Sequence, residues 1–242
     1  MTDATKRELI ADCVHCGFCL PSCPTYLLWG EEMDSPRGRI YLMKNILDGA
    51  PLDEAAMGHF DACLVGLACV TSCPSGVQYD ALIEMTRAEV EAVAARKPRD
   101  AGVRRMIFAL FPYPRRLRAV RPLLRAYQAT GAQRLVRKRM RGTVGTMAGL
   151  VPPLGARQPV AAVTSPVGPK RMRVGMLLGC VQREFFPGVN AATVRVLAAE
   201  GCEVVVPSGQ GCCGALSLHA GREDEALAFA KRLIASFEAL NV

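Results

Sequence analysis

Apolar and polar residues alternate with a helical period through the first part of the chain. Apolar residues recur every three or four positions in residues 39–47, 53–64 and 82–93, which predicts three helices. Cysteines lie between these segments, so helices rather than strands are expected to connect the cysteine runs. We therefore predict a small all-α domain over residues 1–95.

The middle of the chain keeps the helical spacing but mixes its apolar residues with arginines. In residues 96–141, Pro112, Pro114 and Pro122 are expected to break the pattern into short helices. Residues 142–170 hold five prolines among glycine, alanine and valine. That composition predicts an extended linker.

The pattern changes once more after the linker. Short apolar runs at 172–178 and 203–206 predict strands, and helical spacing at 191–200 and 222–240 predicts helices. The order strand, helix, strand, helix is typical of a parallel α/β unit. The predicted fold class is therefore α+β and multidomain, with an α/β domain over residues 171–242.

Charge changes the picture of the middle segment. The chain of 242 residues is half apolar and carries a net charge of +8, but residues 96–141 hold 15 Lys and Arg against one acid, Asp100. This basic helical segment is expected to dock on an acidic subunit or on anionic lipid headgroups, and a merely solvated helical face is the alternative. Nucleic acid is not an expected partner, because the segment matches no reader motif.

The cysteines indicate a reducing compartment. There are eleven, an odd number, and the polar start of the chain does not resemble a signal peptide. We expect a cytoplasmic protein whose thiolates are available for metal. No apolar stretch is long enough for a membrane-spanning helix, so any membrane contact is expected to be peripheral, on the inner face of the cell membrane, or through a partner.

The first cysteine run carries a specific spacing. Cys13, Cys16, Cys19 and Cys23 followed by Pro24 read C-x2-C-x2-C-x3-C-P, the spacing of bacterial ferredoxins. Three thiolates of such a run hold one 4Fe-4S cluster, and the fourth ligates a second cluster. Zinc is less favoured, because zinc sites typically use paired cysteines that lie further apart.

The second run has lost one ligand. Cys63, Cys69 and Cys73 align with the first run, but Gly66 stands where its second cysteine would be. Crosswise ligation assigns one cluster to Cys13, Cys16, Cys19 and Cys73, and the other to Cys23, Cys63 and Cys69. Three thiolates suit a 3Fe-4S cluster, or a site-differentiated 4Fe-4S cluster whose fourth iron carries water or a foreign ligand. Arg37 and Arg39 could compensate the negative charge of a cluster, although arginines at a helix start commonly serve packing and solubility.

Several sequence words resemble known iron-sulfur proteins. The incomplete second run resembles the helical ferredoxin domain of succinate dehydrogenase iron-sulfur subunits. The chain also resembles the iron-sulfur subunit of bacterial glycolate oxidase over essentially its whole length. The resemblance lies in short motifs at residues 14–26, 34–40, 73–77, 177–182, 190–197 and 211–216. Residues 1–95 are then expected to be a helical ferredoxin-like domain.

The resemblance implies an electron-transfer subunit of a complex that oxidises glycolate or a related 2-hydroxy acid. Electrons would pass from FAD in a partner flavoprotein, through these clusters, to quinone or another acceptor. This chain has no dinucleotide or flavin motif, so it is expected to conduct electrons without performing the oxidation itself. The alternatives are an electron-transfer subunit of an anaerobic glycerol-3-phosphate or lactate dehydrogenase, and a degenerate, non-redox structural iron-sulfur protein.

The chain departs from this family in two places. Members usually have a cysteine at the position of Gly66. They also resemble chains with modules of the heterodisulfide-reductase type, which read C, then CCG, then C-x2-C, whereas here Cys180 and the pair Cys212 and Cys213 are followed by no further cysteine. We expect an incomplete cysteine-rich domain, from a truncated gene or a fragment. Its three cysteines are candidate ligands of a further metal centre, with reactive or structural thiols as the favoured alternative.

Overall fold

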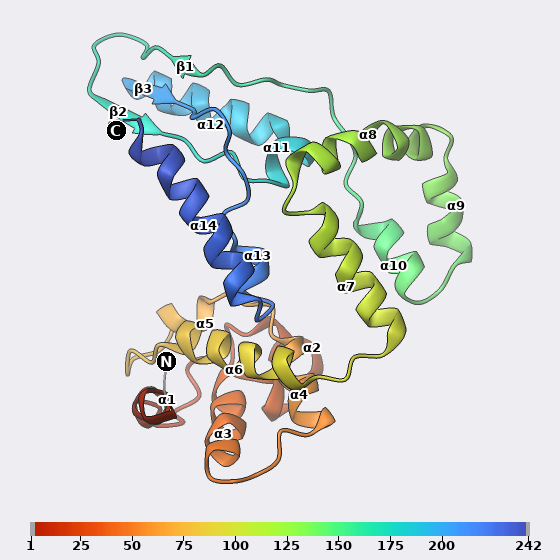
Figure 1. Ribbon diagram of the computed structural model, residues 1–242, viewed down its shortest axis with the longest axis vertical. Coiled ribbons are helices and arrows are strands. Elements are labelled where there is room, and N and C mark those ends of the chain that lie inside the picture. Colours follow the sequence, from red (N-terminus) through yellow and green to blue (C-terminus); the bar gives the residue numbers. More distant parts are fainter. Residues whose placement is uncertain (1–2, 241–242) are drawn as a thin grey trace. The chain divides into compact units, whose positions relative to one another are not determined.

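The computed structural model describes residues 3–240, which divide into two compact units. The first unit contains the chain up to Lys97 together with the later segment Ala215–Glu225. The second contains Pro98–Gly214 and the residues from Ala226 onwards. Figure 1 shows the order of the elements along the chain.

All regular secondary structure in the described part of the first unit is helical. Its elements are α1 (Asp3–Ala11), α2 (Pro24–Trp29), a short 3-10 helix η1 (Glu32–Asp34), α3 (Pro36–Leu47), α4 (Glu54–Ala62), α5 (Ala68–Thr71), α6 (Tyr79–Val93) and α13 (Ala215–Leu218). Side-chain caps set two of the starts: Ser35 accepts from the N–H of Gly38 and Asp53 accepts from that of Ala56. Short loops between these helices carry the cysteines.

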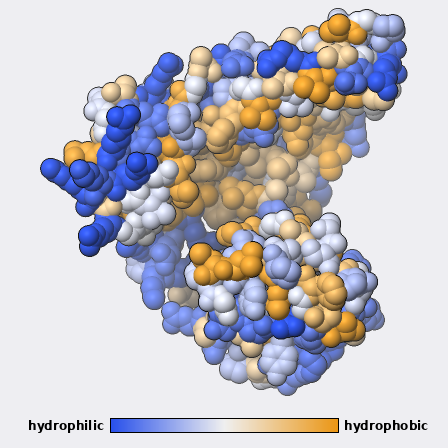
Figure 2. Space-filling model, turned by 180° about the vertical axis from the view of Figure 1, so that it is seen from behind, coloured by the Kyte–Doolittle hydropathy of each residue, from blue (hydrophilic) through white to orange (hydrophobic). Residues whose placement is uncertain are grey.

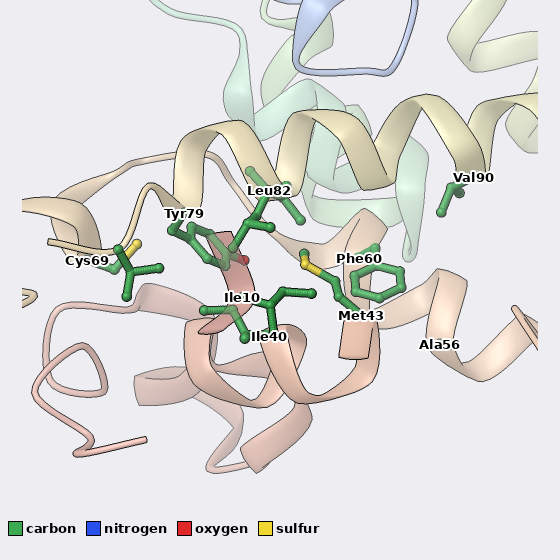
Figure 3. Close-up of a cluster of buried hydrophobic side chains, with 11 residues drawn as sticks. Ile10, Ile40, Met43, Ala56, Phe60, Cys69, Tyr79, Leu82 and Val90 are labelled. Carbon is green, nitrogen blue, oxygen red and sulfur yellow. The ribbon is translucent and has the colours of Figure 1, made fainter. Parts of the chain in front are cut away.

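Helix α6 organises the core of this unit. Its buried residues follow helical spacing along one face, at Tyr79, Leu82, Ile83, Thr86, Arg87 and Val90. Figure 3 shows this face above Ile10, Ile40, Met43 and Phe60, with Cys69 at one end of the cluster and Val90 at the other. The core therefore continues directly into the walls of the cysteine loops.

The second unit begins with four helices and ends in an α/β arrangement. The helices are α7 (Pro98–Leu110), α8 (Pro114–Ala129), α9 (Ala132–Arg139) and α10 (Thr143–Leu150). They are followed by β1 (Val163–Thr164), β2 (Met172–Gly175), α11 (Gln182–Phe185), α12 (Pro187–Ala199), β3 (Cys202–Val205) and α14 (Glu223–Glu238), whose first residues belong to the first unit. The sheet has the order β1-β3-β2. Its core contains Met176, Val194, Cys202, Val204 and Val206.

The predicted fold class is confirmed, since the helical domain and the parallel pair of β2 and β3 are both present. Two details were wrong. Pro122 lies inside α8 and does not end it, so the helix continues without the one hydrogen bond that proline cannot donate. The predicted linker contains α10, and Val163 and Thr164 pair antiparallel with β3, because the open edge of a two-stranded sheet can accept another short strand.

The basic helical segment exposes its charged side chains on α9. No described residue of α9 is buried, and its last turn consists of Arg137, Lys138 and Arg139. Figure 2 shows strongly hydrophilic side chains projecting from this part of the surface. Within residues 3–240, no helix combines the length and the hydrophobicity needed to cross a membrane.

Candidate metal centres

One cavity in the first unit is lined by the cysteines predicted for the first cluster. Cys13, Cys16, Cys19 and Cys73 all lie on its wall, with Cys69 also lining it. The first three come from the loop between α1 and α2, and Cys73 comes from the loop after α5. The fold therefore brings together the thiols that crosswise ligation assigns to one cluster, although ligation itself stays a prediction.

The conformation of the first loop depends on two residues between its cysteines. His15 has φ of 53° and Gly17 has φ of 88°, both in the left-handed region. A Cβ at position 17 would also stand 2.6 Å from a guanidinium nitrogen of Arg37. Glycine is therefore favoured there by its backbone angle, and a side chain at this position would also displace the Arg37 guanidinium.

A second cavity is lined by the cysteines predicted for the other cluster. Cys23, Cys63 and Cys69 lie on its wall, together with Gly66. Cys23 is the last cysteine of the first run, whereas the other two belong to the second run. Cys69, Pro36 and Tyr79 line both cavities, so the two sites share a wall.

Each cavity has one arginine. Arg37 lines the first cavity, where it donates to the carbonyl of His15 at 3.0 Å and pairs with Glu32 at 2.6 Å. Arg39 lines the second and is fully buried. Its guanidinium donates to the backbone and the carboxylate of Asp34, to the hydroxyl of Thr25 and to the carbonyl of His59. The two arginines singled out by the sequence are thus divided between the two sites.

Hydrogen-bond donors reach the Cys63 sulfur in the second cavity. The Val65 N–H donates to Cys63 Sγ at 3.5 Å. The Thr25 hydroxyl, 3.2 Å from Cys23 Sγ, donates its proton to the carbonyl of Asp34 and so accepts from the Cys23 thiol. The buried Tyr79 hydroxyl lies 3.7 Å from the same Cys63 sulfur. Hydrogen bonds of this kind stabilise thiolate ligands and influence the potential of an iron-sulfur cluster.

Burial makes the cavity thiols hard to ionise. It is the main cause that raises the pKa of Cys13 and that of Cys19. Burial, together with the neighbouring Cys63 and Cys23, raises the pKa of Cys69 to about 12. In the metal-free chain these thiols are therefore protonated, and binding iron must displace their protons.

The donor sets fit iron-sulfur clusters. Both cavities offer several soft thiols with N–H or O–H groups and a guanidinium nearby, as cluster sites do. Across residues 3–240, no three side chains of His, Cys, Asp or Glu gather closely enough to hold a single metal ion. The cysteines instead stand apart around the walls of the two cavities.

Arg87 is a supporting residue that the sequence analysis missed. Its guanidinium donates to the carbonyls of Phe60 and Asp61 at the end of α4, to that of Cys63, and to that of His219 in the segment 215–225. Its position on the apolar face of α6 was the available signal, because a charged residue in a buried stripe needs partners. Arg87 therefore caps α4 and holds the backbone of Cys63 at once.

The remaining candidate ligands lie in the second unit. Cys180 follows β2, and Cys212 and Cys213 follow β3, so the parallel strands place both loops beyond the same edge of the sheet. Cys180 Sγ and Cys212 Sγ are hydrogen-bonded at 3.6 Å, while Cys213 is exposed. This bond is the main cause that lowers the pKa of Cys180 to about 7 and raises that of Cys212.

Two polar side chains hold these loops together. The buried Gln210 accepts from the N–H of Leu178 and donates to the carbonyl of Met176, both at 2.9 Å. Arg183 donates to the carbonyls of Gly179 and Gln210 at the same distance. The arrangement brings Cys180 and Cys212 together. A metal centre there stays a prediction.

Comparison with known proteins divides the chain into three matched regions. Residues 9–77 match a family described as a 4Fe-4S dicluster domain. Residues 99–151 match the linker region of the glycolate oxidase iron-sulfur subunit, and residues 174–242 match a cysteine-rich domain. The three regions cover the helical domain, the basic helical segment and the α/β domain in turn.

Curated relatives match nearly the whole chain. A probable glycolate oxidase iron-sulfur subunit of Bacillus subtilis is 38% identical over 98% of this chain and 56% of the relative. The glycolate oxidase iron-sulfur subunit of Escherichia coli is 36% identical over 94% of this chain and 52% of the relative. A lactate utilization protein A of Bacillus velezensis is 42% identical, but over only 28% of each chain. The chain thus spans about half the length of the first two relatives, and no solved structure matches it significantly.

Proposed function

We propose that this chain, a homologue of the glycolate oxidase iron-sulfur subunits, is an electron-transfer subunit. It serves a flavin-dependent complex that oxidises glycolate or a related 2-hydroxy acid. Electrons pass from FAD in a partner flavoprotein to quinone or another acceptor. The lactate or glycerol-3-phosphate alternative is not favoured, because the lactate utilization relative matches little more than a quarter of the chain.

One observation carries the proposal: two cysteine-lined cavities share the wall formed by Pro36, Cys69 and Tyr79. Centres held on the two sides of one wall would be direct neighbours, which suits electron transfer between them. Cys13, Cys16, Cys19 and Cys73 hold a 4Fe-4S cluster. Cys23, Cys63 and Cys69 hold the second centre, as a 3Fe-4S or a site-differentiated 4Fe-4S cluster.

The chain's own residues do the work of binding and adjusting these groups. Thiolates fix the clusters, Arg37 and Arg39 offset their negative charge, and the Tyr79 hydroxyl stabilises the Cys63 thiolate of the second centre. The clusters supply one-electron redox chemistry when bound. Cys180, Cys212 and Cys213 are candidate ligands of a further metal centre, with thiols that bind no metal as the alternative.

Cys16→Ser tests the first centre. Purified without oxygen, this variant should lose about four irons per chain and the absorption of one cluster, because a serine oxygen is a poorer ligand for cluster iron. Cys202→Ala is the matched control, since Cys202 is buried in β3 and lines neither cavity, so this variant should keep the full iron content. Unchanged iron and sulfide in Cys16→Ser would contradict the assignment. A reversible redox titration of the parent chain separates an electron carrier from a structural iron-sulfur protein.

A further inference from the structure

The second cysteine loop repeats the backbone of the first. Val65 has φ of 51° and Leu67 has φ of 56°, at the positions that align with His15 and Gly17 in the first run. A positive φ is uncommon for any residue with a side chain and a true outlier for β-branched valine, so it persists only where the surroundings enforce it. The second loop therefore keeps the conformation of a cluster-binding loop although one ligand is missing.

The position of the missing ligand is open. Gly66 aligns with Cys16, and a Cβ built on Gly66 would meet no atom within 4 Å. Its φ lies outside the left-handed region, so an L side chain would be unstrained there. The space that a cysteine side chain would occupy is thus free beside the second cavity.

No other side chain of the cavity wall takes its place. Among the described residues that line this cavity there is no histidine, aspartate or glutamate. Its three hydroxyls are already engaged: Ser22 donates to the carbonyl of Cys19, Thr25 to that of Asp34, and Tyr79 to Cys63 Sγ. A fourth iron at this corner would therefore have to take its ligand from outside the chain.

The surroundings select the chemistry of that ligand. The buried guanidinium of Arg39 favours an anionic donor, and Leu64, Val65 and Leu67 on the cavity wall favour a short apolar stem. Iron in a thiolate-ligated cluster prefers sulfur as its remaining donor. We propose that the corner at Gly66 binds a small exogenous thiol, which completes the ligand set of the second centre in place of a cysteine.

This inference rests on the proposed function, because it needs the second cluster. The binding step is a ligand exchange without electron transfer: the thiol releases its proton to solvent, and a sulfur–iron bond replaces a bound water. Without thiol, the iron at this corner would be held only by cluster sulfides and solvent, so it would be lost readily as Fe2+. The remaining 3Fe-4S cluster would be in its reduced form and would give one electron to an added oxidant, such as ferricyanide, to reach its oxidised form.

The probe is 2-mercaptoethanol, with ethylene glycol as its oxygen analogue. The full chain is reconstituted anaerobically without thiol and brought to the oxidised state. It then receives ferrous iron, one electron equivalent of dithionite, and one or the other compound, so that both arms have the same reductant and differ only in the candidate ligand. With 2-mercaptoethanol, the paramagnetic signal of the oxidised 3Fe-4S cluster should disappear, the iron content should rise from about seven to about eight per chain, and about one isotopically labelled thiol per chain should remain after desalting. Ethylene glycol should produce none of these changes.

Two cysteine variants provide the controls. Gly66→Cys supplies its own thiolate, so it should hold about eight irons without any thiol and retain no labelled compound. Gly58→Cys adds a cysteine at an exposed position of α4, where a Cβ also meets no atom within 4 Å, and should behave as the parent. Equal retention of label by Gly66→Cys and the parent, or a parent that holds eight irons without thiol, overturns the inference. If neither the parent nor Gly66→Cys assembles a second centre, the proposed function itself is wrong.

Discussion

At the scale of single residues, the two sites differ in how their charges are balanced. Arg37 is partly exposed and pairs with Glu32, whereas Arg39 is fully buried and holds Thr25 and Asp34 against the wall of the second cavity. Reduction adds a negative charge to a cluster, so a buried cation and hydrogen bonds to the sulfurs favour the reduced form. We therefore expect Arg39 and the Tyr79 hydroxyl, which donates to Cys63 Sγ, to raise the potential of the second centre.

Tyr79→Phe tests this expectation with little change in side-chain volume. It removes the hydroxyl that donates to Cys63 Sγ at 3.7 Å. A loss of about 1 kcal/mol of preference for the reduced state corresponds to a potential lower by about 40 mV for a one-electron couple. Potentiometric titration followed by electron paramagnetic resonance should show this shift in the second centre alone. Thr86→Val is the control, because the Thr86 hydroxyl bonds the carbonyl of Leu82 within α6 and should leave both potentials unchanged. A Tyr79→Phe chain with the parent potential would refute the role of the hydroxyl.

At the scale of elements, α6 supports the second site through one side chain. Arg87 satisfies carbonyls at the end of α4, the carbonyl of Cys63 and that of His219, so a single buried guanidinium connects three segments of the first unit. Burial lowers the pKa of this arginine, but the group remains a cation at neutral pH. Removing it leaves buried carbonyls without donors.

Arg87→Met should therefore lower the free energy of unfolding of the first unit by about 2–4 kcal/mol, and should release iron from the second centre faster than from the first. The stability and the iron-release rate of Arg87→Lys should lie between those of the parent and of Arg87→Met, because one ammonium group cannot reach all these carbonyls. Thermal unfolding and the rate of iron release to a chelator measure the two effects. Ile83→Val, on the same face of α6, is a packing control that should lower stability by about 1 kcal/mol without favouring iron loss from one centre. Equal loss from both centres in Arg87→Met would mean that Arg87 serves the fold alone.

At the scale of the whole molecule, the basic helical segment is the feature that points to a partner. Not all of its arginines are available, since Arg118 pairs with the buried Glu184 at 2.9 Å. The exposed end of α9, at Arg137 and Arg139, is the better candidate for docking on an acidic subunit or an anionic membrane surface. Such charges act over about 8 Å at physiological salt, so their contribution should fall as salt increases.

Reversing Arg137 and Arg139 to Glu should weaken association with the flavoprotein or with anionic vesicles about tenfold or more at low salt, and the difference should shrink at high salt. Reversing Arg195 and Lys231, which are exposed on α12 and α14, changes the net charge equally and is the control. Pull-down and vesicle sedimentation across a salt series distinguish a protein partner from a lipid surface. If both double variants weaken binding equally, only the net charge matters and the segment has no special role.

The sequence by itself determined the chemistry of this protein and the type of its elements. Cysteine spacing is a local property of the sequence. It therefore revealed the ferredoxin pattern, the glycine at position 66 in place of a cysteine, and the Cys180 and Cys212-Cys213-Gly214 motifs. The periodicity of apolar residues predicted the main helices and the parallel strands. Tertiary structure decided what depends on contacts between distant segments. It divided the cysteines between two cavities that share a wall, placed Arg39 and Arg87 among carbonyls far away in sequence, extended α8 through Pro122 and added β1 to the sheet. A buried cation or an edge strand is stable only where its partners are, and a linear pattern does not contain those partners.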